Sequence, residues 1–232
     1  MPLKVIPRRD RKLHRLVKKG ETLTLKRGQA LFHPGDPARD LFLVRKGHLR
    51  LWHPGREARP QRIVAIVGPW ELGGERGLFP GAFRDSGATA GEDSVVTVLD
   101  GAGARRALQT SEKTFEAFLM AKESELALAE ALKGYRKPGG ARARLGLLLL
   151  NLADRIGRPG DGGIRIPIRL THQLLADLAA SHRSTVTTIL NDWIYREVIQ
   201  EKEGHLEIPE PGGLGESTGR GASPSSVDPK TL

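Results

Sequence analysis

The sequence predicts an α+β protein with a strand-rich N-terminal half, one long helix, and a C-terminal third of short helices and strands. Three observations lead to this fold class. Turn glycines and prolines separate short β-prone runs between residues 20 and 100. A segment rich in Ala, Leu, Glu and Lys follows them. Two further helical patterns, close together, precede a pair of short strands that ends near residue 208.

The composition favours a cytoplasmic protein that binds polyanions. The 232 residues contain 37 Lys and Arg against 27 Asp and Glu, which gives a net charge of +10. Nucleic acid is therefore the first candidate partner, and a generally basic protein without that partner is the alternative. A membrane span needs about 18 consecutive apolar residues, and the chain has no such run. The basic segment 1–19 also lacks the apolar stretch of a secretory signal.

The absence of cysteine narrows the chemistry further. It excludes disulfides, thiolate zinc sites, iron–sulfur clusters and cysteine nucleophiles. The seven histidines are scattered, and no P-loop or Ser-His-Asp arrangement stands out. We therefore expect no metal site, no cofactor and no enzymatic activity.

Residues 20–103 are predicted to form a β-rich domain. The β-prone runs are "ETLTL", "LFLVRKGHLRLW", "RIVAIVG" and "SVVTVLD". In "HLRLW", Leu49 and Leu51 alternate with His48 and Arg50, which indicates a half-buried strand with the polar pair on its outer side. Short strands with frequent turns are typical of a sandwich or barrel.

Residues 104–136 are predicted to form one long helix. Its apolar side chains recur at spacings of three, four and seven, on one face. The stripe consists of Phe115, Phe118, Leu119, Leu126, Ala129 and Leu132. It is either ordinary core or the surface through which the helix pairs with its copy in a dimer, and periodicity alone leaves both open.

Residues 137–208 are predicted to contain a helix-turn-helix. Thr171 caps a first helix, and a tight turn at Ala180-Ser181 follows, with Ser181 as the next cap. The second helix buries Val186, Ile189, Leu190 and Trp193. Two short helices that meet at such a turn place the second one in the major groove of DNA. From residue 209 onward, the Gly/Ser/Pro composition predicts a disordered tail to residue 232.

The outer face of this unit suits DNA recognition. Arg183 is placed to donate two hydrogen bonds to a guanine, and the expected base-reading residues are Arg183, Ser184, Thr187 and Thr188. The expected phosphate contacts are Thr171, His172, Gln173, His182, Thr185, Arg142, Arg144, Arg169 and Lys202. Between residues 133 and 172 the chain carries nine cations against two acids, a footprint for phosphate binding. A helical hairpin with a merely solvated outer face is the structural alternative.

The order of these parts resembles the CRP/FNR superfamily of dimeric bacterial transcription regulators. "RGQALFHPGDPARDLFLVRKGHLRLW" looks like the opening of the family's cyclic-nucleotide-binding-type β-roll, a jelly roll. "GGERGLF" resembles its phosphate-binding cassette, and "LTHQLLADLAASHRSTVTTIL" its DNA-binding helices. "ARLGLLLLNLADRIG" is most similar to the nitrogen-control (NtcA-like) branch. The "VIQEKEGHLEIPE" strand pair would then be the wing of a winged helix-turn-helix.

The resemblance implies a function and partners. The chain would pair through residues 106–136 as a homodimer on double-stranded DNA, bind a near-palindromic promoter site, and act with RNA polymerase. Arg183 falls at the family's guanine-reading arginine. Ser184 and Thr188 depart from the residues of cyclic-AMP-responsive members, which implies a different half-site. Ala180 stands where the usual turn glycine would be, with some left-handed backbone strain.

The same resemblance raises the question of an effector. The candidate pocket consists of Gly74, Glu75, Arg84 and Ser86, in which Glu75 matches the ribose acceptor. Asp85 holds the place of the arginine that neutralises the cyclic phosphate, which argues against cyclic AMP. Because neighbouring strand residues point to opposite faces, Arg84 is expected to face away from that place. Glu125 stands near the arginine of 2-oxoglutarate-binding relatives, so that ligand is not supported either.

Two functional hypotheses therefore remain. The first is a DNA-binding regulator that is not controlled by cyclic AMP, with any other small effector left open. The second is a cyclic-nucleotide-domain signalling or scaffold protein that senses another small effector and carries a degenerate DNA-binding head.

Overall fold

The computed structural model describes residues 20–55, 61–134 and 140–217. The basic segment 1–19 and residues 218–232 of the predicted tail lie outside these ranges. Within them, no helix is both long enough and apolar enough to span a bilayer.

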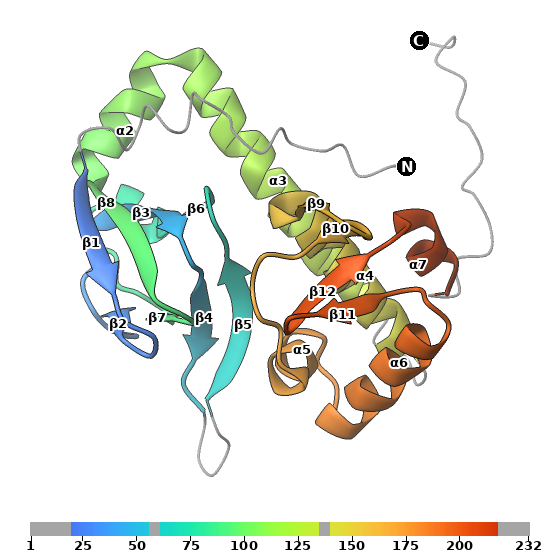
Figure 1. Ribbon diagram of the computed structural model, residues 1–232. Coiled ribbons are helices and arrows are strands. Elements are labelled where there is room, and N and C mark those ends of the chain that lie inside the picture. The colour runs from blue at the N-terminus through green and yellow to red at the C-terminus, as the bar shows by residue number, and fades with distance from the viewer. Residues whose placement is uncertain (1–19, 56–60, 135–139, 218–232) are drawn as a thin grey trace, which may run out of the picture.

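The N-terminal domain is a β-roll of two four-stranded antiparallel sheets (Figure 1). One sheet has the order β1 (Glu21–Leu25), β8 (Ser94–Asp100), β3 (Asp40–Lys46) and β6 (Leu72–Gly73). The other has the order β2 (Ala30–Phe32), β7 (Gly87–Ala90), β4 (Leu49–His53) and β5 (Arg62–Val67). Buried Phe42 and Val44 of the first sheet pack with Leu49 and Ala88 of the second. The predicted jelly-roll class is confirmed.

His48 lies deep inside this roll, contrary to the outward position that the alternating pattern predicted. Its side chain is 1% exposed, and its Nδ1 lies 3.0 Å from a Glu92 carboxylate oxygen. Gly91 makes room for the ring, since a Cβ at Gly91 would lie 1.9 Å from His48 Nε2. Burial lowers the pKa of His48 even though Glu92 favours the charged form.

This burial predicts a pH dependence of stability. Because the folded-state pKa of His48 lies below its ordinary value, the unfolded chain takes up a proton first as the pH falls through about 6.5. The free energy of unfolding should then fall with pH, by at most about 1.4 kcal/mol per pH unit. His48→Gln should flatten this slope in chemical denaturation at about pH 7.5 and about pH 5.5. His33→Gln, at an exposed histidine, should leave the slope unchanged. An unaltered slope in His48→Gln would contradict the prediction.

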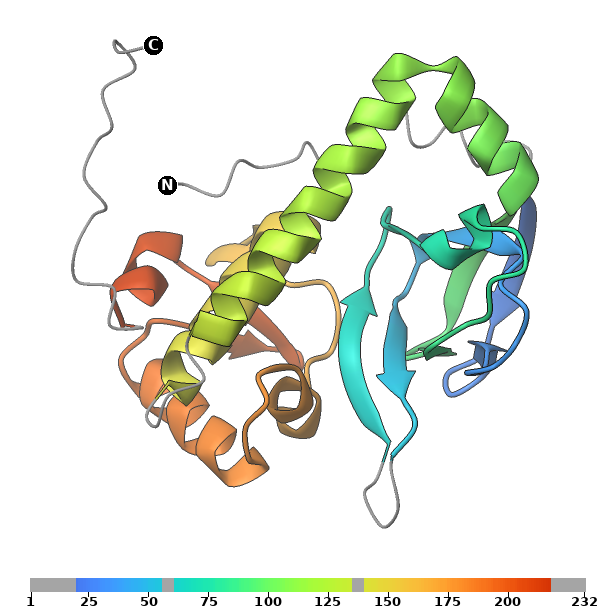
Figure 2. The same ribbon diagram turned by 180° about the vertical axis from the view of Figure 1, so that it is seen from behind.

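Two helices, not one, leave the roll. α2 (Gly101–Thr110) ends at Ser111, and α3 (Glu112–Gly134) begins immediately after it. The Ser111 hydroxyl accepts a hydrogen bond from the Thr114 backbone N–H at 3.3 Å, as an N-cap does. The predicted single helix over 104–136 is therefore wrong at this break, because a local capping side chain overrides the continuous helical composition. Figure 2 shows α3 as the long diagonal helix that runs from the roll to the C-terminal domain.

The C-terminal domain consists of helices and a small antiparallel sheet around one core. The helices are α4 (Ala141–Ile156), α5 (His172–Leu178) and α6 (Arg183–Tyr195). The sheet has the order β11 (Gln200–Lys202), β12 (His205–Ile208), β10 (Gly163–Arg165) and β9 (Arg158–Gly160). Trp193 is its largest fully buried side chain. The β11–β12 hairpin occupies the place of the predicted wing.

A short helix, α7 (Pro211–Ser217), contradicts the first part of the predicted disordered tail. Its Leu214 is 0% exposed and belongs to the core of the C-terminal domain. A single buried leucine thus anchors a segment whose glycines and proline indicated disorder.

Candidate DNA interface and effector cassette

The turn between α5 and α6 is built by local capping and by one long-range side chain. The Thr171 hydroxyl accepts a hydrogen bond from the Leu174 N–H at 3.2 Å, which confirms the predicted cap of α5. Ala180 has φ 47°, so the expected left-handed strain is present. The predicted Ser181 cap is wrong, because His182 is the N-cap of α6 and makes no side-chain capping bond.

Arg144 on α4 holds this turn in place. Its Nε donates to the carbonyl oxygen of Ala179 at 2.6 Å, and its Nη2 donates to that of Ala180 at 3.1 Å. The guanidinium therefore satisfies carbonyls next to the strained residue. The sequence predicted Arg144 as a phosphate contact, and in the structure its guanidinium positions this turn.

α6 presents one polar face to solvent. Val186, Ile189, Leu190 and Trp193 are buried as predicted. The exposed side chains on the opposite face are His182, Arg183, Ser184, Thr185 and Thr188, with Thr187 half-buried. Two of the threonines are partly engaged. Thr188 Oγ1 donates to the Ser184 carbonyl, and Thr187 Oγ1 donates to the Arg183 carbonyl while lying 2.8 Å from His172 Nδ1.

The other predicted phosphate contacts fall into two groups. Arg142, Lys202 and Gln173 have partners inside the domain: Arg142 lies 2.7 Å from Asp192, Lys202 3.2 Å from Glu207, and Gln173 2.8 Å from Asp177. Arg169 is exposed beside the wing glycine Gly204. Of these four side chains, Arg169 and Gln173 are exposed, whereas Arg142 and Lys202 are half-buried.

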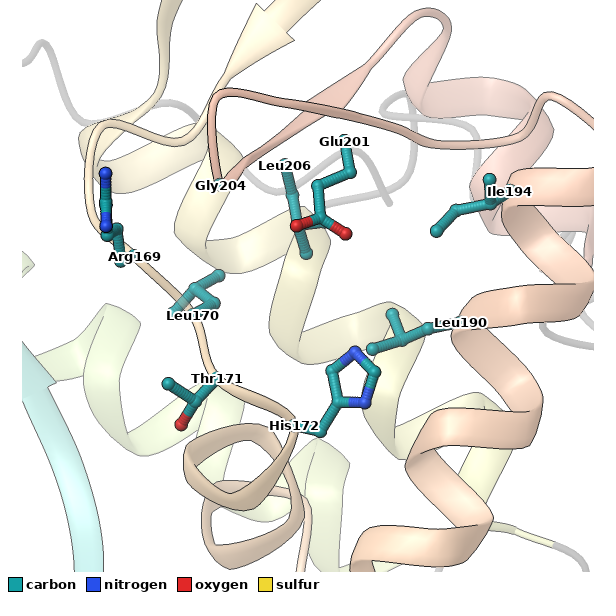
Figure 3. A pocket seen from close by; sticks show the side chains of 9 residues that line it. All are labelled: Arg169, Leu170, Thr171, His172, Leu190, Ile194, Glu201, Gly204 and Leu206. Atoms are coloured by element: carbon teal, nitrogen blue, oxygen red, sulfur yellow. The ribbon is translucent and has the colours of Figure 1, made fainter.

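A pocket of about 210 Å³ separates α6 from the wing (Figure 3). Leu190 and Ile194 of α6 and Leu206 of the wing form its apolar wall. His172 and Glu201 point toward the same space. This pocket could not be predicted from the sequence, because its apolar side chains belong to segments separated in sequence and are indistinguishable from core residues by pattern.

The cassette residue Glu75 is held by helix α3. Glu75 lies in a 3-10 turn, η1 (Glu75–Leu78), and its carboxylate pairs with Lys122. Lys122 also lies 2.9 Å from Glu125. Although burial opposes it, the two carboxylates raise the pKa of Lys122. The expected ribose acceptor thus has a lysine of its own chain as partner.

Arg84 points into the cassette, so the expectation that it faces away is wrong. It is 5% exposed, its Nη1 donates to the Gly74 carbonyl at 3.1 Å, and its Nη2 donates to Asp40 Oδ1 at 2.6 Å. The guanidinium also lies 4.2 Å from the centre of the Phe32 ring. Strict alternation fails here because the segment before Gly87 forms only an isolated bridge, Pro37 to Phe83, and is no regular strand.

Asp85 pairs with Arg76 at 2.8 Å, and both side chains are about half exposed. Both residues also line the cassette cavity together with Glu75, Arg84 and Ser86. Although partial burial opposes it, the Arg76 guanidinium lowers the pKa of Asp85. The cavity between Glu75, Arg84 and Ser86 measures only about 60 Å³, whereas ligand sites usually enclose about 300–1,000 Å³. The structure brings all four predicted pocket residues together. The two charged ones, Glu75 and Arg84, already form ion pairs with Lys122 and Asp40. Among the described residues, no cluster of three or more His, Asp or Glu could hold a metal ion.

Comparisons with known proteins identify the class that this arrangement defines. The model of the cyclic nucleotide-binding domain matches residues 22–111, and that of the Crp-like helix-turn-helix domain matches residues 143–217. The chain is 30% identical over 188 residues to the cyclic AMP receptor protein of Thermus thermophilus, covering 79% of this chain and 81% of the relative. It is 26% identical over 190 residues to the global nitrogen regulator of a Nostoc species, covering 81% and 85%. The chain belongs to the CRP/FNR family of DNA-binding transcription regulators.

Solved structures show the same fold. FixK2 from Bradyrhizobium japonicum superposes with a TM-score of 0.70 at 16% identity, covering 85% of this chain and 96% of that one. A CRP-family regulator from Thermus thermophilus superposes with a TM-score of 0.63 at 23% identity, again covering 85% and 96%.

Proposed function

We propose that this regulator binds a near-palindromic promoter site as a homodimer and that its DNA binding does not need cyclic AMP. The observation that carries the proposal is the exposed polar face of α6, with Arg183 at the first helical position. An arginine there reaches the edge of a guanine when the helix enters the major groove. A regulator bound at a promoter acts on transcription through RNA polymerase, which is the proposed protein partner.

The surface of α3 supports the homodimer. Phe115, Leu119 and Leu126 are between 46% and 58% exposed, and Met120 beside them is 54% exposed. Large apolar side chains in a row on one helix mark an interaction surface. A second copy of the same helix is the occupant that fits the twofold symmetry of a palindrome. Phe118 instead packs against the core of the roll and anchors the helix.

The cassette supports independence from cyclic AMP. The carboxylate of Glu75 and the guanidinium of Arg84 are the groups that a nucleotide would need. Lys122 pairs with the first and Asp40 with the second. A cyclic nucleotide would have to displace both partners to reach these two groups, and it would have to enlarge the cavity.

Selection from random duplex DNA tests these proposals in one experiment. The protein should recover a palindrome whose half-site centres lie roughly 34 Å apart, with the same sequence and yield whether cyclic AMP is absent or present. Recovery of unrelated sequences would contradict specific reading and favour a scaffold with a degenerate DNA head. Recovery only with cyclic AMP would contradict the proposed independence.

A further inference from the structure

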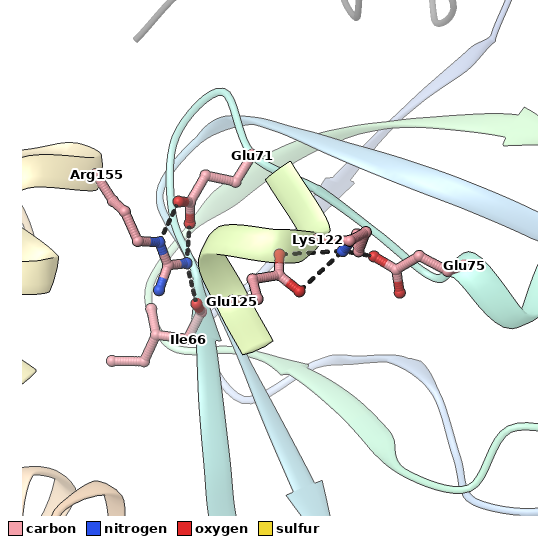
Figure 4. A network of polar contacts seen from close by, with 6 residues as sticks. All are labelled: Ile66, Glu71, Glu75, Lys122, Glu125 and Arg155. Carbon is pink, nitrogen blue, oxygen red and sulfur yellow. Dashed lines mark hydrogen bonds and ion pairs between the residues drawn. The ribbon is translucent and has the colours of Figure 1, made fainter. Parts of the chain in front are cut away.

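An ion pair joins the β-roll to the DNA-binding domain (Figure 4). Arg155, in the last turn of α4, donates from Nε to Glu71 Oε1 and from Nη2 to Glu71 Oε2, both at 2.7 Å. Its Nη2 also donates to the Ile66 carbonyl of β5 at 3.1 Å, and its Nη1 donates to Asn151 Oδ1 at 3.1 Å. Planar two-point contacts of this kind fix orientation as well as distance.

The β-roll side of this pair is held rigidly. The Gly68 N–H donates to Glu71 Oε2 at 2.7 Å, which orients the carboxylate from within its own turn. Trp70 in that turn has φ 72°, a conformation that a bulky residue adopts only when its surroundings enforce it. The Trp70 N–H donates to the Val44 carbonyl at 2.7 Å, and Arg45 lies 4.8 Å from the ring centre.

The ion pair sits on a close apolar contact between the same two domains. Ile66 of β5 is 4% exposed and belongs to the core cluster of the DNA-binding domain. A Cβ at Gly68 would lie 2.6 Å from Ile156 Cγ2, next to Arg155 in sequence. Although burial opposes it, the Glu71 charge raises the pKa of Arg155, so the guanidinium stays charged.

We propose that Glu71 and Arg155 are positioning residues that set the distance between the two recognition helices, and thereby the half-site spacing that the dimer accepts. The inference rests on the proposed palindrome-binding homodimer. α4, α5 and α6 share one core, so they move together. The apolar stripe on α3 sets the dimer axis. The Glu71–Arg155 ion pair holds α4, α5 and α6 in one orientation relative to the roll. The orientation of α6 relative to that axis therefore depends on this contact.

The first test measures spacing preference. The half-sites obtained by selection are held constant while the spacer between them is varied. The wild-type protein should prefer one spacing, and Glu71→Gln should reduce the ratio of the best to the next spacing by about tenfold, as expected for the loss of a charge-assisted contact. Arg155→Lys keeps the charge and loses the two-point geometry. Its spacing ratio should therefore lie between those of the wild-type protein and Glu71→Gln. Affinity for a single half-site should remain unchanged in both variants.

A matched control removes one negative charge elsewhere. Asp93→Asn breaks an ion pair on the surface of the β-roll, in which Asp93 lies 3.0 Å from Lys26. It should retain the wild-type spacing preference. Loss of affinity at every spacing in Glu71→Gln, with the preference intact, would overturn the inference and leave a merely stabilising ion pair.

The second test needs no DNA. Because the chain contains no cysteine, Tyr195→Cys, at a residue 88% exposed, gives one spin label per subunit. The label-to-label distance in the dimer should be narrowly distributed with Glu71 intact and at least about twice as broad in Glu71→Gln, since the minor orientations gain population. Equal distributions would overturn the inference.

Failure of the proposed function can be distinguished from failure of the positioning role of Glu71 and Arg155. If the wild-type protein is monomeric or ignores paired half-sites, the proposed function fails. Labels at Glu21→Cys and Tyr195→Cys in one chain then still report whether Glu71 and Arg155 hold the two domains together. An unchanged intrachain distance distribution in Glu71→Gln contradicts the positioning role in that case as well.

Discussion

Replacing Arg183 by alanine should strongly reduce sequence discrimination while the protein stays folded. Arg183 is exposed at the first position of α6. A bidentate arginine–guanine contact contributes about 1–3 kcal/mol of discrimination at each half-site, and a dimer carries two. Affinity for the selected palindrome should therefore fall toward that for unrelated DNA, measured by competition binding at fixed salt.

The matched control is Arg196→Ala. Arg196 follows the other end of α6, is 68% exposed and pairs with Asp192 at 2.8 Å. Its loss removes the same charge and should leave the discrimination ratio nearly unchanged. If Arg183→Ala and the wild type rank cognate and unrelated duplexes alike, Arg183 does not read a base.

Replacing Trp193 by alanine should destabilise the DNA-binding domain by about 3–5 kcal/mol, the usual loss for a large aromatic in a packed core. Trp193 is 0% exposed and packs with α4, α5 and the wing in one cluster. The Arg142 guanidinium lies 5.5 Å from the centre of its ring, so the substitution also disturbs the link between α4 and α6. Chemical denaturation followed by circular dichroism measures the change in the free energy of unfolding.

Tyr195→Ala provides the comparison, because Tyr195 lies two residues further along the same helix and is 88% exposed. Its effect should stay within about 0.5 kcal/mol. A Trp193→Ala protein as stable as Tyr195→Ala would show that the cluster around α6 is not the core that the structure describes.

The sequence predicted those parts of the fold that depend on neighbours along the chain. β1 and β8 coincide with the predicted runs because both contain several β-branched residues, which favour strands. The Thr171 cap and the buried positions of α6 follow from spacing in the same way. The break at Ser111 was missed because the capping tendency of one serine competes with a strongly helical composition.

Contacts between residues far apart in the chain could not be predicted from the sequence. Lys122 and Glu75 are 47 residues apart, and Arg155 and Glu71 are 84 apart. No local pattern indicates which of many charged residues will meet. The direction of Arg84 could not be predicted either, since it depends on an irregular segment and on an acidic partner in β3.

The pairing of Arg84 with Asp40 has a consequence for any dissolved anion that approaches the cassette. Asp40 is tethered to the same polypeptide, so its effective concentration at the guanidinium greatly exceeds that of a metabolite in free solution. Burial raises the pKa of Asp40 against the opposing influence of Arg84, and a competitor would have to release this carboxylate into water. Asp40 therefore already occupies the anion-binding group of the cassette. A variant that responds to an anionic ligand would first have to lose this carboxylate.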